Sequence, residues 1–579
     1  MADSARRAAA ELATLGDEFF GVLHAVDPLG ATQLGVSGFD DLLPDPSRSG
    51  AHAHARSLRA VEDRLASIDT TALEPTARTS ASVLGALAAA TRIDLEHGLW
   101  EANASAQGYV NPQAMAFQAI PTALLEDRPA VDAYLERLSG LGRFFDAIGQ
   151  RYREAAAEGR TSPAVGVRQA IEQLEGHLAS DPARHRLQPP SLPPTVDEDA
   201  TRARIDTLIT GVVRPALERL HGVLRDELLP SARPDDRVGI GNVPGGAEGY
   251  LAAVARQTTT TLTPEEIHAI GLECLEELRG EWAEIGDRAL SERDPSRILE
   301  RLREDPALRF HSTGEIVAVV ADALERAEAA RDAWFPRFSI PRCIIEEIDP
   351  LEAGNSTLAY YRPPAAGGRR PGAHCVLTAE PERRFIYEYE ALAFHESTPG
   401  HHLQVAFAQT LDHLPDFRRY LDAEVCAYVE GWGLYSERLA DEMGLYSSDV
   451  ARLGMLSFDA LRACRLVVDT GMHHLGWSRE RAIDFMWSHT ATTRENVVNE
   501  IDRYIGWPGQ ALAYMIGRRE ILRLRAEAED ALGSRFDVRG FHGAVLGEGA
   551  VPLGVLGEVV ERWVSEQRAG GAPDQKEAG

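Results

Sequence analysis

Two histidines and a glutamate in the segment FHESTPGHHLQ, residues 394–404, are of the types that zinc peptidases use. In the H-E-x-x-H motif of those enzymes, two imidazoles four residues apart share a helix face and bind the metal, and the glutamate acts as general base. Here His395 and Glu396 are followed by Pro399 at the fourth position, and the next histidine, His401, stands six positions after His395. The residue types therefore indicate metal-dependent hydrolysis, although their spacing departs from the motif.

This spacing does not suit joint ligation from one continuous helix. His401 would lie about 120° around the helix from His395, and His402 about 10 Å further along the axis. Pro399 lacks the backbone donor and clashes with the carbonyl four residues before it, and Gly400 permits unusual dihedrals. We therefore predict a bulge that absorbs two extra residues, with His395 and His401 as metal ligands and His402 as the fallback. The alternative is a surface helix that ends at Pro-Gly and carries ordinary histidines.

A third ligand is predicted in the next helix, over about residues 418–443. Glu430 stands there beside Gly431 and Gly433, and a glycine inside a helix costs about 1 kcal/mol relative to alanine. Two such glycines indicate the close approach of another backbone or of a site. A helix–loop–helix could return Glu430 to the histidines, whereas a glutamate on a helix, taken alone, is usually a solvated charge.

Three more residues are candidates for contact with a substrate. Arg503 and Tyr504 precede a helix break at residues 507–510, and His473 lies on a helix predicted over residues 448–475. A phenol in a cleft can stabilise an oxyanion, and a guanidinium can hold a carboxylate. We expect Tyr504 to donate to the oxyanion, Arg503 to hold a substrate carboxylate and His473 to lie in the same cleft. The alternatives are a packed aromatic, a salt bridge and a structural histidine.

Composition excludes some classes of function. The chain has 579 residues, of which 26% are charged, and its net charge is −29. A surface that binds nucleic acid needs clustered lysine and arginine, so we expect no nucleic-acid partner. The first residues, MADSARR, show no apolar signal core and no lipidation cysteine, and no apolar run approaches 18 residues; we expect a cytoplasmic protein with no membrane partner. The five cysteines form no C-x-x-C pair, which suits a reducing compartment.

The apolar periodicity predicts a mainly α-helical fold with a small β element beside the His-Glu helix. The length of the chain predicts more than one packed region within one continuous fold: an N-terminal helical scaffold over residues 1–190, a helical region completing the cleft over 191–335, and a catalytic region over 336–579. Capping boxes at Thr263 and Ser312 predict two helix starts. Short β-prone runs are expected at residues 343–345, 356–361 and 374–378. Such a strand could hold an extended substrate, and the alternative is a structural hairpin.

These residues resemble the bacterial family called domain of unknown function 885. The resemblance covers nearly the whole chain and is most specific in HESTPGHHLQ, VEGWGLYSE, RLVVDTGMH and RYIGWPGQALAY. It implies a largely helical fold similar to that of the carboxypeptidase Taq type of zinc metallopeptidase, which is marked by H-E-x-G-H and a downstream glutamate. His395-Glu396 and Gly400-His401 match that pattern on either side of a two-residue insertion, and Glu430 matches the downstream ligand.

The sequence thus predicts a hydrolase with one Zn²⁺ per chain, most simply a metallopeptidase of carboxypeptidase or dipeptidase type acting on a peptide or small amide. Glu396 would take a proton from water and pass it to the leaving amine. Two alternatives stay open: a metal-dependent amidase or esterase on a non-peptide substrate, and a helical binding protein whose insertion has pulled the imidazoles apart. Substrate, exo- or endo-specificity, physiological metal and oligomeric state are not in the sequence.

Overall fold

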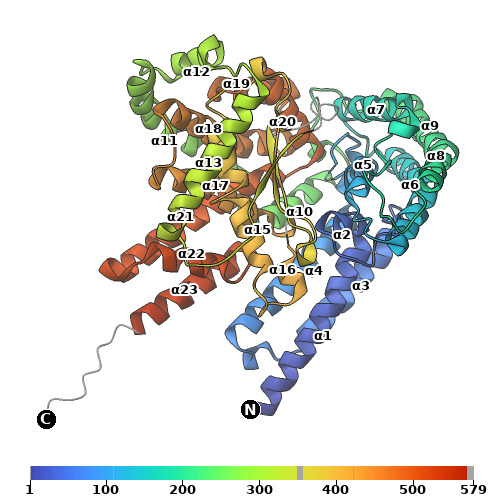
Figure 1. Cartoon of the computed structure of the whole chain (residues 1–579), viewed down its shortest axis with the longest axis horizontal. Coiled ribbons are helices and arrows are strands. Elements are labelled where there is room, and N and C mark those ends of the chain that lie inside the picture. The colour runs from blue at the N-terminus through green and yellow to red at the C-terminus, as the bar shows by residue number, and fades with distance from the viewer. Residues whose placement is uncertain (1, 109, 349–356, 422, 570–579) are drawn as a thin grey trace.

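The computed structural model describes residues 2–108, 110–348, 357–421 and 423–569. Over these ranges the chain consists mainly of α-helices with one small sheet, which confirms the predicted fold class (Figure 1). No helix in the described ranges combines the length and the apolar character that crossing a bilayer requires.

The first four helices follow the predicted apolar periodicity. Leu15 and Phe19, one turn apart on the first of them, are fully buried, as is Leu58 on the third. Capping fixes some of their ends: the Ser47 side chain accepts from the Gly50 amide at the start of the third helix. The helices are α1 (Ala2–Val26), α2 (Pro28–Leu34), α3 (Arg48–Ala66) and α4 (Pro75–His97).

The next helices enclose a separate apolar cluster and lie together at one side of the molecule (Figure 1). Leu187 and Ile205 both belong to this cluster, so the predicted joint at residue 190 falls inside it. The division into three regions stays a prediction. The helices are α5 (Pro112–Ala119), α6 (Arg128–Ala157), α7 (Ala164–Ala179), α8 (Glu198–Leu208) and α9 (Arg214–Gly222), with π-helical turns at Ile209–Val213 and Val223–Leu228.

The capping box predicted at Thr263 is present at the start of α11. The Thr263 side chain accepts from the Glu266 amide, and the Glu266 carboxylate accepts from the Thr263 amide. At Ser312 only half of the box forms, because the Glu315 carboxylate accepts from the His311 amide instead. The helices of this region are α10 (Gly246–Thr258), α11 (Pro264–Leu290), α12 (Pro295–Glu304) and α13 (Thr313–Trp334).

The small sheet lies where the β-prone runs predicted it. It contains β1 (Ile344–Glu347), β2 (Ala359–Arg362) and β3 (Ala373–Val376), in the order β1-β3-β2. β1 is parallel to β3, with Ile344 opposite Ala373, and β2 is antiparallel to β3, with Tyr361 opposite His374. Ser356, where the second run was expected to begin, is outside the described residues.

The remaining helices contain the candidate site. The segment that contains the His-Glu pair forms two helices, α14 and α15, and the helix predicted over 418–443 begins only at Cys426, after the short α16. The Ser448 side chain caps α18 by accepting from the Ala451 amide. The helices are α14 (Tyr389–Glu396), α15 (His401–Gln409), α16 (Asp416–Arg419), α17 (Cys426–Glu442), α18 (Asp449–His473), α19 (Arg479–His489), α20 (Arg494–Gly506), α21 (Ala513–Leu532), α22 (Val538–Leu546) and α23 (Leu553–Ala569).

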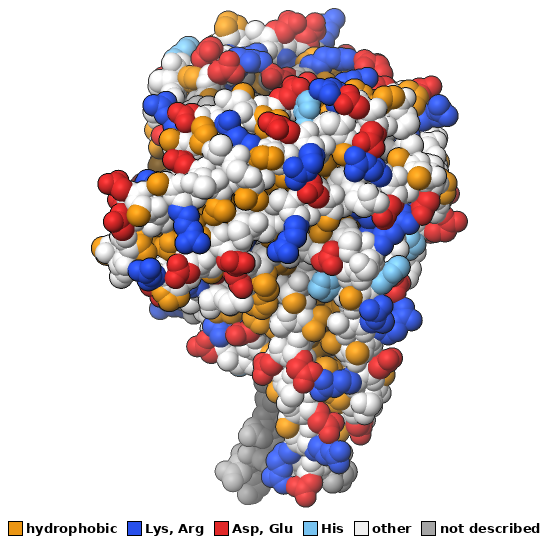
Figure 2. Space-filling view, turned by 90° about the vertical axis from the view of Figure 1, so that its right-hand side faces the viewer, with side chains coloured by type: hydrophobic (Ala, Val, Ile, Leu, Met, Phe, Trp, Pro, Cys, Tyr) orange, Lys and Arg blue, Asp and Glu red, His pale blue; other side chains and the backbone are white. Residues whose placement is uncertain are grey.

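Helix α18 is the central element of this region. Every residue from Leu453 to His473 is buried, polar and charged residues included, so this stretch of the helix has no solvent face. It packs along α11, while α17 packs along α21. A helix buried on all sides is a rigid support, and its buried arginines and aspartates need partners within the core. On the face seen in Figure 2, acidic and basic side chains are interspersed, so the negative charge does not gather there.

Candidate metal centre

The predicted bulge between His395 and His401 is a break between two helices. α14 ends one residue after His395, and α15 begins at His401, with a four-residue turn between them. The turn folds back tightly, since a Cβ on Gly400 would lie 1.9 Å from the carbonyl oxygen of His395. The Trp432 indole donates to the carbonyl of Pro399 at 2.9 Å and joins the turn to α17. The two extra residues are therefore taken up in the turn.

The break brings both histidines and two glutamates together. The His395 and His401 ring centroids are 4.7 Å apart, and these residues and Glu396 each offer a ligand atom within 4.8 Å of the others. Oε2 of Glu430 lies 3.3 Å from Nε2 of His401 and 3.6 Å from Nε2 of His395. Ligand atoms bonded tetrahedrally to zinc at 2.0–2.2 Å are about 3.3–3.6 Å apart. The two distances from Glu430 to the histidines thus match edges of a zinc site, and the insertion leaves the two imidazoles close together.

The two glycines of α17 have separate structural reasons. A Cβ on Gly431 would lie 2.5 Å from the backbone of Gly517, where α17 and α21 cross. A Cβ on Gly433 would lie 2.7 Å from Cε1 of His395 and 2.9 Å from Cε1 of His401. The sequence predicted that another backbone or a site approaches these glycines closely. Gly431 meets another backbone, and Gly433 meets the two histidine rings.

A carboxylate behind His395 orients its ring. The Nδ1 of His395 lies 2.8 Å from Oε1 of the buried Glu437, and Arg462 lies 3.3 Å from the same oxygen. A carboxylate that accepts from Nδ1 leaves Nε2 to face the metal, as in the carboxylate–histidine–metal arrangement. Burial opposes protonation of His395, but Glu430 and Glu437 outweigh it and raise its pKa to about 9. The surroundings of the imidazole therefore favour positive charge.

The same balance applies to Glu430. Burial favours its neutral form, yet the hydrogen bonds with His395 and His401 hold the pKa of the carboxyl well below its ordinary value. Nδ1 of His401 is buried and has no hydrogen-bond partner among the described residues. An ionised carboxylate facing two imidazole Nε2 atoms is a donor set that suits zinc.

The comparisons with known proteins agree with the sequence motifs. The family described as "Bacterial protein of unknown function (DUF885)" matches residues 28–560. This chain belongs to the DUF885 family. No curated protein matches the chain.

Solved structures extend the comparison. A protein described as a putative lipoprotein from Colwellia psychrerythraea is similar to the DUF885 chain with a TM-score of 0.89 and 26% identity, covering 96% of this chain and 99% of its own. A protein described as a putative lipoprotein of unknown function from Shewanella oneidensis has a TM-score of 0.72 and 17% identity, with 95% and 99% covered. The second similarity, at this identity, shows the fold alone.

His402, the fallback ligand, is engaged elsewhere in the DUF885 chain. Its Nδ1 lies 3.1 Å from the Tyr361 hydroxyl, and its Nε2 lies 2.8 Å from the carbonyl oxygen of Pro341. Both ring nitrogens are therefore used in positioning β2 and the segment before β1. Of the two adjacent histidines, His401 is the one that faces Glu430.

Tyr504 and Arg503 belong to an internal network. The Tyr504 hydroxyl donates to Glu500 and accepts from Nε of Arg465 at 2.7 Å. Arg503 donates to Gln510 at 2.9 Å and to Glu500 at 3.1 Å. Within the described part of the chain, no hydrogen bond or ion pair joins Tyr504 or Arg503 to the candidate ligands. Contact of either residue with a substrate stays a prediction. The hydrogen bonds observed here do not favour it.

His473 is committed to the core. Its Nδ1 accepts from the Ile240 amide at 3.0 Å, and its Nε2 lies 3.0 Å from the Tyr504 carbonyl oxygen. Burial lowers its pKa to about 4, so the ring is neutral. A place in the substrate cleft is a prediction without support from these contacts.

Sequence reasoning missed Tyr514 and Glu437. The Tyr514 ring stacks on His395 with centroids 6.3 Å apart, so it contacts the centre, which Tyr504 does not. Both residues stand at the ends of motifs that identify the family, RYIGWPGQALAY and VEGWGLYSE. Glu437 is also seven residues, two helical turns, after Glu430, which places both on one face of α17. That spacing is the signal that could have found it.

The sheet also contacts the break between α14 and α15. His374 of β3 lies 3.3 Å from the Ser397 hydroxyl, and the Tyr361 ring of β2 lies 6.4 Å from that of His401. The β element is therefore beside the candidate centre, as expected. Pairing of a strand with the backbone of a substrate stays a prediction.

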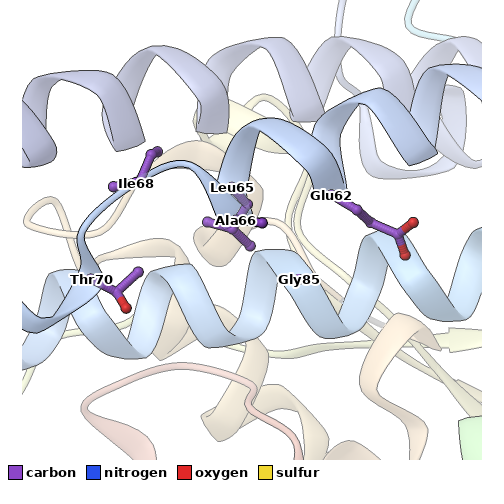
Figure 3. Close-up of a pocket in the computed structure, with 6 residues that line it drawn as sticks. All are labelled: Glu62, Leu65, Ala66, Ile68, Thr70 and Gly85. Carbon is purple, nitrogen blue, oxygen red and sulfur yellow. The ribbon is translucent and has the colours of Figure 1, made fainter.

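A hollow of about 400 Å³ lies elsewhere, between α3 and α4 (Figure 3). Glu62 is the one charged residue in its lining, and Leu65, Ala66, Ile68, Thr70 and Gly85 complete it. It offers no set of converging polar groups. The chemistry of the ligand set, rather than the size of a hollow, therefore identifies the candidate site.

Proposed function

We propose that this DUF885 protein is a zinc-dependent hydrolase that cleaves peptide bonds. One observation carries the proposal: Oε2 of Glu430 lies 3.3 and 3.6 Å from the Nε2 atoms of His401 and His395. Support also comes from Glu437, whose carboxylate lies 2.8 Å from Nδ1 of His395 and would leave Nε2 to the metal. The likeness to carboxypeptidase Taq-type zinc peptidases rests on the sequence motifs.

His395, His401 and Glu430 would hold the metal, and Glu396 would handle protons. Zinc, when bound, supplies Lewis-acid polarisation of a carbonyl group and makes water more acidic. Glu396 is buried and offers a carboxylate oxygen within 4.8 Å of ring nitrogens of His395 and His401, so it would take a proton from water and give it to the leaving amine. Tyr514, stacked on His395, is the better candidate than Tyr504 for donation to the developing oxyanion.

Metal content tests the proposal directly. Tag-free protein purified without chelator is expected to contain about one zinc per chain by plasma mass spectrometry. His395→Ala, His401→Ala and Glu430→Ala should each lose it, whereas His402→Ala should keep it. Wild-type protein that takes up no zinc, even after incubation with it, would refute the proposal.

Turnover tests the role of Glu396. Glu396→Gln is expected to retain zinc and to abolish hydrolysis of a peptide panel. Loss of zinc in this variant would show that Glu396 is a ligand instead. An ester and non-peptide amide panel, assayed beside the peptides, separates a peptidase from an amidase or esterase.

A cytoplasmic location, and the absence of nucleic-acid and membrane partners, stay predictions. The two related structures come from proteins described as putative lipoproteins, so the location of this protein deserves its own measurement. Fractionation of the native producing cells, with antibody detection, would assign it to the cytoplasm or to the envelope.

A further inference from the structure

Three residues of α18, spaced four apart, bind the chain at the break between α20 and α21. Nε of Arg465 donates to the Tyr504 hydroxyl at 2.7 Å. Asp469 accepts from the Gly509 amide, whose nitrogen lies 3.2 Å from each carboxylate oxygen. Nε2 of His473 lies 3.0 Å from the Tyr504 carbonyl oxygen. Residues four apart share a helix face, so one face of α18 fixes the break, and the proposed reaction gives this face no role.

Asp469 connects the break to a second helix. It is fully buried, and its carboxylate also accepts from the Tyr250 hydroxyl of α10 at 2.7 Å. Gly509 has a φ of +83°, which glycine adopts without steric cost, and a Cβ there would lie 3.3 Å from the α10 backbone. The break therefore lies between α10 and α18, and one carboxylate binds both α10 and the backbone just before α21.

The residue after Gly509 extends this connection to Tyr514. Oε1 of Gln510 accepts from Arg503 at 2.9 Å, and because a guanidinium can only donate, this bond fixes the orientation of the amide. Nε2 of Gln510 lies 3.5 Å from the Tyr514 hydroxyl oxygen and 3.5 Å from Sγ of Cys426. The Tyr514 oxygen thus accepts from Gln510, and the phenolic proton is left for another acceptor. Burial raises the pKa of Tyr514, so the hydroxyl keeps that proton.

We propose that Asp469 is a positioning residue for Tyr514: it fixes the helix break, and Gln510 then holds the Tyr514 hydroxyl with its proton directed to the developing oxyanion. Asp469 acts at a distance, through the backbone of Gly509 and the side chain of Gln510. The Tyr514 ring, stacked on His395, completes the path to the candidate centre. The inference rests on the proposed function, since it concerns the reaction of that centre.

The protonation state of Asp469 gives this role a signature. Burial outweighs its hydrogen bonds and the charge of Arg503 and raises its pKa to about 7. Above that pH the ionised carboxylate accepts strongly from the Gly509 amide, whereas below it the neutral acid accepts more weakly and is close to an asparagine in shape and charge. The titratable and charged groups of the surrounding elements are Tyr250 of α10, Arg503 of α20, Arg465 and His473 of α18 itself, and His268 of α11, which bonds to the neighbouring Thr470.

The ratio of kcat between wild type and Asp469→Asn, followed from about pH 6 to about pH 8, tests the role. Zinc-loaded protein is assayed on the peptide that the wild type cleaves fastest in the peptide panel. The ratio is expected to rise from below about 2 to about 5–10 over this range, with KM and zinc content unchanged. Other groups that titrate in the site affect both proteins alike and cancel in the ratio. A ratio that does not change with pH would overturn the role of Asp469.

A double-mutant cycle decides whether Asp469 acts through Tyr514. In a Tyr514→Phe background, Asp469→Asn should change kcat by less than about twofold, because the hydroxyl that it positions is absent. Losses of kcat that multiply would overturn the inference. Gln510→Met removes the amide but leaves Arg503 bonded to Glu500, so it should lower kcat about 5- to 10-fold and provides a second variant if Asp469→Asn does not fold.

Asp27→Asn is the matched control. The Asp27 carboxylate also accepts from a backbone amide, that of Gly30 in α2, and burial raises its pKa to about 6. Its kcat ratio to the wild type should stay constant with pH. Amide hydrogen exchange of residues 507–514, followed by mass spectrometry at about pH 8, needs no turnover and should be about 5- to 10-fold faster in Asp469→Asn but unchanged in Asp27→Asn.

These measurements separate the two ways to fail. Wild-type protein that binds no zinc or cleaves no peptide would overturn the proposed function, and the exchange of residues 507–514 would still show whether Asp469 fixes the break. Unchanged exchange in Asp469→Asn would overturn the positioning role and leave the metal centre standing.

Discussion

Replacement of Gly433 by alanine is expected to weaken zinc binding without unfolding the protein. The new Cβ would lie 2.7 Å from Cε1 and 2.8 Å from Nε2 of His395, and 2.9 Å from Cε1 of His401. Carbon atoms in contact are normally about 3.5–4.0 Å apart. Both imidazoles must therefore retreat by roughly 0.6–1.3 Å, and the atoms that must move are ends of side chains rather than backbone.

The two consequences have opposite signs. Metal–ligand distances tolerate about 0.2 Å, so a retreat of this size is expected to lower zinc affinity at least about tenfold. The helix, by contrast, gains up to about 1 kcal/mol when alanine replaces glycine in its interior. The free energy of unfolding of the zinc-free protein should therefore change by less than about 1 kcal/mol. A competition titration against a chromophoric chelator measures the first quantity, and urea unfolding with chelator measures the second.

Two other glycines provide controls. A Cβ on Gly431 would lie 2.5 Å from Cα of Gly517 and 2.9 Å from the Arg518 amide nitrogen, which are backbone atoms of a packed helix. Gly431→Ala should therefore lower the free energy of unfolding by about 1–3 kcal/mol or more. Gly280 of α11 has open space around it, so Gly280→Ala should stabilise by up to about 1 kcal/mol with zinc affinity unchanged. A folded Gly433→Ala protein that binds zinc as tightly as the wild type would refute the assignment of His395 and His401.

Three further outcomes concern other parts of the network. Glu437→Gln weakens the acceptor behind His395 and should lower zinc affinity about 10- to 100-fold in the same titration; no change would mean that packing alone orients the ring. Burial raises the pKa of Glu388 from 4.5 to about 7, so the folded protein binds this proton more tightly than the unfolded chain, and stability is lost as pH rises through that window. Glu388→Gln should remove this loss, which is at most about 3 kcal/mol of unfolding free energy between pH 5 and 8, as measured by urea unfolding. An unaltered dependence of stability on pH would contradict the prediction. Tyr504→Phe should lower stability by about 1–2 kcal/mol and spare zinc content, whereas Tyr514→Phe should lower kcat with the fold intact; the reverse pattern would exchange their roles.

Local signals in the sequence predicted the elements and the ligand set. Thr263 and Ser448 mark helix starts because a cap needs only residues within one turn. Pro399 and Gly400 predicted an interruption of the helix, which the structure shows as a break, because their effects act on their own backbone. Glu430 became a candidate because two glycines stand beside it. Glycine inside a helix lowers its stability, and the close contacts of Gly431 and Gly433 explain why glycine is needed there.

Contacts between distant segments needed the tertiary structure. Tyr504 and Tyr514 lie on either side of the same helix break, and no periodicity tells which of them turns toward the candidate ligands. The crossing of α18 and α21 decides it, by placing Tyr514 between His395 and Arg465.

The sequence by itself determined a mainly helical fold, the break after the His-Glu pair and the types of ligand available, since propensity, capping and motif spacing act over a few residues. The tertiary structure decided that His401 rather than His402 faces Glu430, and that Arg462 stands behind Glu437. These relations depend on how helices from separate parts of the chain pack against one another, and side-chain packing is set by the whole core.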